Sequence, residues 1–283
     1  MNVTKIADIR KGLQDGAVFG KYLFRFNGRG NGLAYEMDKI ASGGMVEPVA
    51  EFVLDRADEI APHSNAVVFG SEYFEDGDEF PLLYSNIYNN YAKTDTPLKG
   101  VCCVYRLQRD GESFKTTLVQ LIEIGFAEDA HLWKASPEKD GARPYGNFVV
   151  DTDAGKYYAF VMRNEENGTR YFVFDLPRLY DGEIDEKYGV KRVVLTPSDI
   201  KKQFDTPEHH YIQGACCKGG KVYSVEGFRN HPALRIINPE KGEQELFLDF
   251  SDFGIIDEAE FIDFYDDKCF YGDVNGKIYR IEF

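Results

Sequence analysis

One strand–turn–strand pattern recurs along the chain, and this repeat constrains the fold more than any other feature. Residues 13–26 read LQDGAVFGKYLFRF and residues 209–228 read HHYIQGACCKGGKVYSVEGF, so both pass through Gly-Ala and a Gly-Lys turn into an aromatic-rich strand. Related stretches begin at His63, Tyr145 and Glu258, which gives five copies. A supersecondary unit repeated at this scale indicates a repeat architecture.

Each copy predicts antiparallel strands joined by tight turns. Asp110-Gly111, Lys218-Gly219-Gly220 and Asn275-Gly276 supply the positive-φ positions that tight hairpins need. Side chains of opposite character alternate in places, as in the stretch YFVFDL at residues 171–176. Five four-stranded antiparallel units predict an all-β fold, a five-bladed β-propeller.

The repeat assigns the whole chain to one propeller domain. The fifth copy lacks a fourth strand, and the N-terminal segment VTKIADIR is β-compatible, so we expect this segment to complete the last blade. Two stacked β-sandwiches are the alternative, but they leave the N-terminal segment and the five-fold spacing unexplained. Helix is expected only as a short turn in TPSDIKKQFD (196–205), capped by Thr196 or Ser198. The expected blades cover residues 13–55, 63–126, 145–197, 211–250, and 258–283 together with 2–10.

Charge and hydropathy exclude several classes of partner. The formal net charge is −15, whereas nucleic acids and anionic membranes select basic surfaces. No apolar run of about 18 residues exists, and the charged N-terminus lacks the apolar core of a signal peptide. We therefore expect a cytoplasmic protein that does not insert into membranes.

The five cysteines include the vicinal pairs Cys102-Cys103 and Cys216-Cys217. Adjacent side chains on a strand point to opposite faces, so the two thiols of a pair are poorly placed to bind one metal ion. We therefore expect buried, reduced thiols.

The expected site lies at one mouth of the central channel. In a propeller the starts of the innermost strands and the ends of the second strands share one face, and most of the long loops decorate that face. Polar side chains also gather there, although a single Asn or Asp at a strand end often only satisfies turn backbone. The candidate ligand-binding residues are Arg25, His63, Asn65, Asn86, Asn147, Arg163, His210, Gln213, Glu226 and Glu260.

Two kinds of chemistry are compatible with this ring of residues. Amide and carboxylate oxygens aimed at one axis need water or a cation, and Asn65, Asn147 and Glu260 are the candidate ligands of a divalent ion such as Ca²⁺. Ordered water alone is the simpler alternative. His63 and His210 stand where a general base would lie, but hydrogen bonding to blade edges explains them equally well.

Over its whole length the chain resembles bacterial five-bladed β-propeller proteins of uncharacterised function. The resemblance rests on PHSNAVVFGSEYF, YGNFVVDTD, HYIQGACCKGGKVYSVEGF and the closing EAEFIDFYDDKCFYGDVNGKIYRIEF. These stretches specify blade architecture rather than chemistry. A more distant likeness is to six-bladed lactonases and five-bladed nucleotidases that hold calcium on the axis, and here only isolated Asn and Glu positions match.

Two classes of function follow from the sequence. The first is a binding module whose channel mouth takes a small polar or sugar-like molecule. The second is an enzyme on the same face, either a metal-dependent hydrolase or lactonase or a glycosidase using Asp15, Glu258 and Glu260. We prefer the binding module because no complete catalytic set is visible. A protein partner docking on the acidic face is a third hypothesis, which the sequence does not test.

Overall fold

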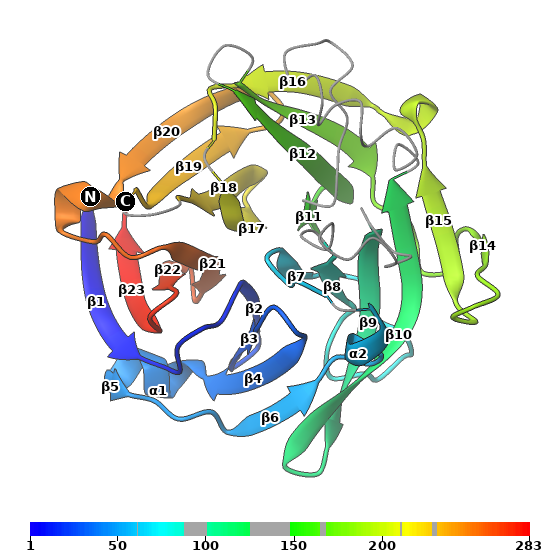
Figure 1. The fold of residues 1–283 in the computed structure, drawn as a ribbon, viewed down its shortest axis with the longest axis horizontal. Helices are drawn as coiled ribbons and strands as arrows, with labels where there is room; N and C mark the ends of the chain where they lie inside the picture. The colour runs from blue at the N-terminus through cyan, green and yellow to red at the C-terminus, as the bar shows by residue number, and fades with distance from the viewer. Residues whose placement is uncertain (61, 88–100, 125–147, 165–167, 210, 228–230) are drawn as a thin grey trace.

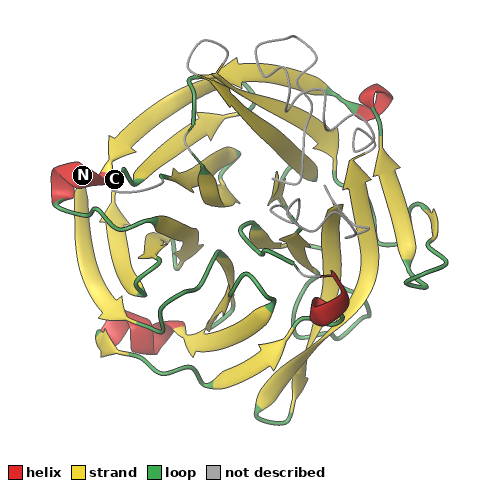
Figure 2. Cartoon of the chain, in the orientation of Figure 1, coloured by secondary structure: helices red, strands yellow, loops and turns green. Residues whose placement is uncertain are grey.

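The computed structural model describes residues 1–60, 62–87, 101–124, 148–164, 168–209, 211–227 and 231–283. Five sheets surround a central axis, each with its first strand innermost, as the prediction of a five-bladed β-propeller requires (Figure 1). Strands dominate the ring, and short helical turns lie between them (Figure 2). The described residues contain no helix that is both long and apolar enough to cross a membrane.

The blades follow one another in chain order, and their strands run from the axis outwards. The first blade consists of β2 (Gly16–Phe19), β3 (Tyr22–Phe26), β4 (Asn31–Glu36) and β6 (Ala50–Val53). The second begins with β7 (Val67–Phe69), β8 (Leu83–Asn86), β9 (Val101–Asp110) and β10 (Ser113–Ile124). The third consists of β11 (Phe148–Asp151), β12 (Lys156–Asn164), β13 (Gly168–Asp175) and β16 (Lys202–Thr206). The fourth consists of β17 (Ile212–Lys218), β18 (Lys221–Glu226), β19 (Ala233–Asn238) and β20 (Glu243–Asp249).

The fifth blade joins the two ends of the chain. It consists of β21 (Ala259–Tyr265), β22 (Lys268–Asp273), β23 (Lys277–Glu282) and the N-terminal β1 (Asn2–Asp8). β1 pairs antiparallel with β23, with Thr4 opposite Arg280, so the predicted closure of the ring is confirmed. A short strand, β5 (Gly44–Met45), then adds parallel to the outside of β1. β5 follows α1 (Met37–Ser42), so the connection from the first blade also covers the edge of the fifth.

The third blade differs from the sequence prediction. Residues 191–197 were expected as its fourth strand, but β15 (Lys191–Leu195) pairs parallel with β10 of the second blade, with Val193 opposite Ile122. A two-residue strand, β14 (Glu183–Ile184), adds beyond it. The fourth strand of the third blade is β16, which pairs with β13, so the expected boundary at residue 197 is wrong. Between them lies the 3₁₀ turn η3 (Pro197–Asp199), which Thr196 caps as expected.

The core consists of apolar layers between neighbouring blades. Between the first and second blades, Phe24 meets Phe69, Phe80 and Phe114 edge-on, with ring centroids 5.1–5.7 Å apart. Such edge-to-face pairs contribute roughly 0.5–1.5 kcal/mol each beyond the burial of their area. The Phe-rich composition is therefore used to join one blade to the next.

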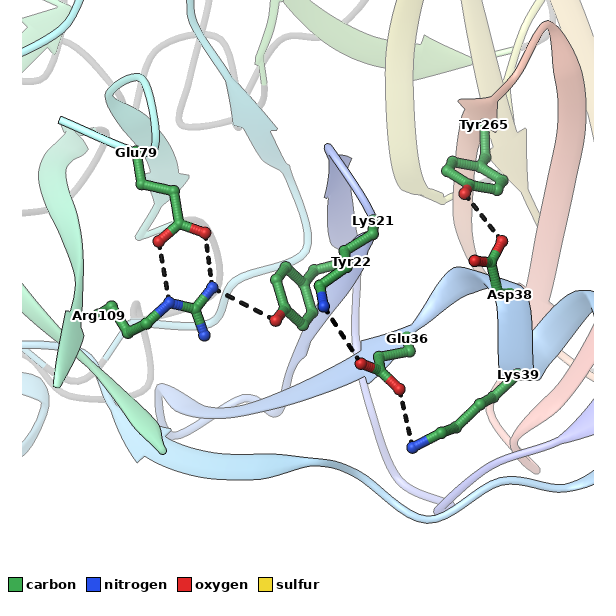
Figure 3. Close-up of polar contacts among 8 residues, drawn as sticks. All are labelled: Lys21, Tyr22, Glu36, Asp38, Lys39, Glu79, Arg109 and Tyr265. Atoms are coloured by element: carbon green, nitrogen blue, oxygen red, sulfur yellow. Dashed lines mark hydrogen bonds and ion pairs between the residues drawn. The ribbon is translucent and has the colours of Figure 1, made fainter. Parts of the chain in front are cut away.

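Three separate groups of polar contacts lie on the face at the β2–β3 turn (Figure 3). Tyr265 of the fifth blade donates to Asp38 of α1 at 3.0 Å. Glu36 accepts from Lys21 and Lys39, and Arg109 of the second blade reaches both Glu79 and the Tyr22 hydroxyl. The charged side chains of these pairs are partly exposed, so each pair contributes little to stability alone, whereas the Tyr22 ring is buried. The opposite face, where the inner strands begin, carries the buried side chains of Asp15, Asn65 and Glu260.

Candidate functional site

Strand pairing brings the expected site residues to one end of the axis. Gly16 at the start of β2 lies opposite Arg25 near the end of β3, and Ala259 at the start of β21 lies opposite Asp273. The start of each inner strand and the end of the second strand therefore share an edge, as the sequence predicts. We refer to this end of the axis as the channel mouth.

A chain of side-chain hydrogen bonds crosses the channel mouth. Asn86 of the second blade donates to Asn65 Oδ1 at 3.2 Å, and Asn65 Nδ2 donates to Gln213 of the fourth blade at 3.4 Å. Gln213 Nε2 then donates to Glu258 of the fifth blade at 2.6 Å. We call these four residues the mouth network. The network links three blades through carboxamide groups, which both donate and accept, and through the Glu258 carboxylate, which accepts.

Asp15 closes the axis beside this network. Its Oδ2 accepts a hydrogen bond from the backbone amide of Val67 in the second blade at 3.0 Å. A Cβ placed on Gly214 of the fourth blade would lie only 2.8 Å from Asp15 Oδ1. The carboxyl group therefore extends from the first blade across the axis, and glycine at 214 leaves room for it.

Two buried carboxyl oxygens have no hydrogen-bond partner among the described residues. They are Asp15 Oδ1 and Glu260 Oε2. The other oxygen of Glu260 accepts from Gln14 at 3.5 Å. Burial raises the pKa of Asp15 well above its usual value, and burial together with the nearby charge of Glu258 does the same to the pKa of Glu260. Both groups are thus biased towards the protonated form, in which each could donate a hydrogen bond.

Arg25 stabilises the same region from within the protein. It is fully buried, and its Nε and Nη2 donate to the Gln14 carbonyl at 3.0 and 2.7 Å. Its guanidinium lies 4.9 Å from the centre of the Phe261 ring. Burial lowers the pKa of Arg25, and the charges of Asp15 and Glu260 oppose that effect. Arg25 therefore holds the backbone from which the Gln14 and Asp15 side chains project.

The remaining sequence candidates lie in several environments. His63 is half-buried near Gly28, and its burial lowers its pKa. Glu226 is buried and pairs with Arg235 at 2.6 Å on the side of the fourth blade. Asn147 and His210 lie outside the described residues, and Arg163 lies in β12 with a side chain that is not described.

The structure thus brings together Asn65, Asn86 and Gln213 in the mouth network, with Glu260 close by. The sequence named Asp15 and Glu258 only as candidate glycosidase carboxylates, and the ligand-binding set included neither of them nor Gln14. For Asp15 the missed signal is position, since Asp15 and Gln213 each directly precede a Gly-Ala pair in their copies. Arg235 and Gln244, which contact each other at 2.7 Å, were missed altogether because both lie on outer strands.

The proposed calcium ligands are only partly described. Asn65 Oδ1 already accepts from Asn86, whereas Glu260 Oε2 has no partner among the described residues. Within that part of the chain, no three His, Cys, Asp or Glu side chains form a group that could hold a metal ion. A calcium site at Asn65, Asn147 and Glu260 stays a prediction. The five cysteines are all free thiols; four are buried and Cys217 is partly buried.

Comparisons with known proteins support the fold. No protein-family model matches the chain, and no curated protein is significantly similar to it in sequence. Among solved structures, it is similar to glutaminyl cyclase of Myxococcus xanthus, with a TM-score of 0.52 and 11% identity over 100% of this chain and 94% of that one. It is also similar to the PQQ-bound aldose sugar dehydrogenase of Streptomyces coelicolor, with a TM-score of 0.51 and 12% identity over 99% and 97% of the two chains. At such identities the likeness shows a shared propeller fold and nothing of activity.

Proposed function

We propose that the channel mouth binds a small polar, hydroxyl-bearing molecule, and that the protein acts as a rigid binding module. The observation that carries this proposal is the mouth network from Asn86 to Glu258, together with the buried oxygens of Asp15 and Glu260 that lack a partner within the described part of the chain. Buried polar atoms without partners are costly, so water or a ligand should satisfy them.

The chemistry of these groups favours hydroxyl groups as the partners. A hydroxyl both donates and accepts, and the mouth offers amide donors beside carboxyl oxygens. Gln14, Gln213 and Glu258 are half-buried, so they are the members that a ligand would reach first. The two similar enzymes named above share only 11% and 12% identity with this chain, which is too low to transfer a reaction.

A thermal-shift screen followed by calorimetric titration tests the proposal. The probes are glucose, N-acetylglucosamine, myo-inositol and glycerol, with ethanolamine and acetate as charged comparators. A molecule that binds only the folded state raises the melting temperature in proportion to its occupancy. We expect at least one hydroxylated probe to do so.

Glu258→Gln keeps the shape of the side chain but removes its charge, so we expect it to weaken that binding by about tenfold. Glu282→Gln, an exposed change on β23, serves as the control and should leave the affinity unchanged. The proposal is wrong if no hydroxylated probe shifts the melting temperature, or if Glu258→Gln binds as well as the unmodified chain.

A further inference from the structure

A second cavity, separate from the mouth network, opens on the side of the fourth blade. It measures about 410 Å³, and its lining includes Tyr211, Glu226, His231, Arg235, Phe247 and Asp249. This volume is within the range of small-molecule sites. None of these residues belongs to the mouth network.

The cavity lies where the fourth blade faces the third. Side chains two residues apart on a strand share a face, so Val222 and Glu226 of β18 lie on one side of the sheet. Val222 and Ile237 pack in one apolar cluster with Tyr171 of the third blade. Further along the same face, towards the channel mouth, the residues change to Glu226 and Arg235. The interface between the two blades therefore turns from apolar to polar, and there it opens into the cavity.

The cavity lining carries two carboxylates, Glu226 and Asp249, one guanidinium, Arg235, and the imidazole of His231. Arg235 Nε donates to Glu226 at 2.6 Å, and the two side chains are 8% and 2% exposed. Arg235 Nη1 donates to Gln244 at 2.7 Å. Hydrogen bonds from Ser251 lower the pKa of Asp249, and the nearby His231 has a smaller effect in the same direction. The cavity thus presents donors and acceptors side by side without a large excess of either charge.

Two aromatic rings stand at the cavity. Phe247 is 49% exposed and lies 4.5 Å from the Arg235 guanidinium, and Tyr211 is 57% exposed. Tyr211 has φ of +54°, a conformation that costs a bulky residue free energy. The neighbouring Gly227 has φ of +128° and no room for a Cβ, which would lie 2.2 Å from the His231 carbonyl oxygen. The backbone at Tyr211 and Gly227 is therefore held in conformations that few residues adopt.

We propose that this cavity binds a neutral polyhydroxylated molecule, such as a sugar ring. Hydroxyl groups match the donors and acceptors of the lining, Arg235 and Glu226 already pair with each other, and exposed aromatic rings can pack against the apolar face of a sugar. An anionic ligand would meet two carboxylates against one guanidinium in this lining.

The test is a ligand-observed NMR titration with glucose, galactose, maltose and cellobiose, with glucuronate and glucosamine as charged comparators. We expect at least one neutral sugar to bind with a dissociation constant in the range of about 0.1–10 mM. Tyr211→Ala should weaken that binding by roughly three- to tenfold, because an aromatic contact is lost. Tyr180→Ala removes an exposed tyrosine elsewhere, 70% exposed, and should leave the affinity unchanged.

The result also separates this site from the channel mouth. Sugar binding at the cavity should persist in Glu258→Gln, because that change alters only the mouth network. The proposal for the cavity and the proposal for the channel mouth can therefore be refuted independently of each other. The proposal is overturned if no neutral sugar binds up to about 10 mM, if Tyr211→Ala has no effect on sugar binding, or if only the charged comparators bind.

Discussion

Asp15 of the first blade accepts a hydrogen bond from the backbone amide of Val67 in the second blade at 3.0 Å, while its other oxygen lies against Gly214 of the fourth. One side chain thus contacts two other blades at the axis. The contact fixes how closely the inner strands approach each other at the channel mouth. It also places a buried carboxyl where a ligand would enter.

Gly214→Ala tests this close approach. The added methyl group would lie 2.8 Å from Asp15 Oδ1 and 3.0 Å from the Glu260 carbonyl oxygen, so the axis would have to expand. We expect a loss of about 1–3 kcal/mol in the free energy of unfolding, measured by urea denaturation. Gly28→Ala is the matched control, since its methyl would make only ordinary contacts at 3.5 Å or more. Equal stability of the two variants would show that Asp15 does not fill the axis.

The raised pKa of the Asp263 carboxyl should make the stability of the protein depend on pH. Its Oδ2 accepts from the Val18 amide at 2.7 Å, and burial raises its pKa to about 6. A folded-state pKa above the unfolded value of about 4 means that the folded protein binds the proton more tightly. The group's contribution to stability is therefore fully present below pH about 4 and is lost as the pH rises to about 6.

Asp263→Asn should remove this contribution and flatten the stability profile between pH 4 and 6, by at most about 3 kcal/mol. The profile is measured as the urea midpoint against pH. Asp267→Asn changes an exposed carboxylate in the adjoining turn and should keep the original profile in this window. An unchanged profile in Asp263→Asn would mean that another group causes the dependence.

The sequence predicted the parts of the fold that depend on local chemistry. The Gly-containing turns, the alternation within strands and the missing fourth strand of the last copy suffice to predict five blades closed by β1. The partner of β15 could not be predicted, because KRVVL is an equally good strand on either sheet. β15 pairs with β10 because the outer edge of β10 has backbone groups left to pair. That free edge exists only once the sheet of the second blade has assembled.

The candidate site was predictable by position but not by role. Asn65, Asn86 and Gln213 were expected at the mouth because their places in the repeat coincide. Arg25 is buried against Phe261 and donates to the Gln14 carbonyl. This role depends on which neighbouring blade supplies the aromatic ring, and the spacing of residues in the sequence does not encode which blade that is. The cavity of the fourth blade likewise arises between strands that are distant in sequence.

Breaking the ion pair between Arg235 and Glu226 should cost more stability than breaking an exposed pair, because it leaves a buried charge without this partner. Arg235→Met removes the partner of a carboxylate that is 2% exposed, and we expect a loss of about 3–5 kcal/mol in the free energy of unfolding. The double variant Glu226→Met with Arg235→Met should recover much of that loss, since no buried charge remains. Lys218→Met, which breaks an exposed pair with Asp267, should cost less than about 1 kcal/mol. A similar small cost for Arg235→Met would contradict this prediction.

The predicted calcium site has a direct thermal test. If Glu260 and the two asparagines hold Ca²⁺, dialysis against EDTA should lower the melting temperature, and calcium should restore it more effectively than magnesium, manganese or zinc. Glu260→Gln should abolish the selective response. Equal responses to all four ions, or none, would contradict an axial calcium ion.

Side-chain amide NMR tests ligand binding at the channel mouth most directly. The NH₂ resonances of Gln14, Asn65, Asn86 and Gln213 report on the mouth, that of Gln244 reports on the fourth-blade cavity through Arg235, and that of Asn2 reports on a distant surface. We predict that a hydroxylated probe found by thermal shift moves the Gln213 and Asn65 resonances in a saturable manner and leaves Asn2 unchanged. If the probe binds while the mouth resonances stay fixed, the channel mouth is not the binding site.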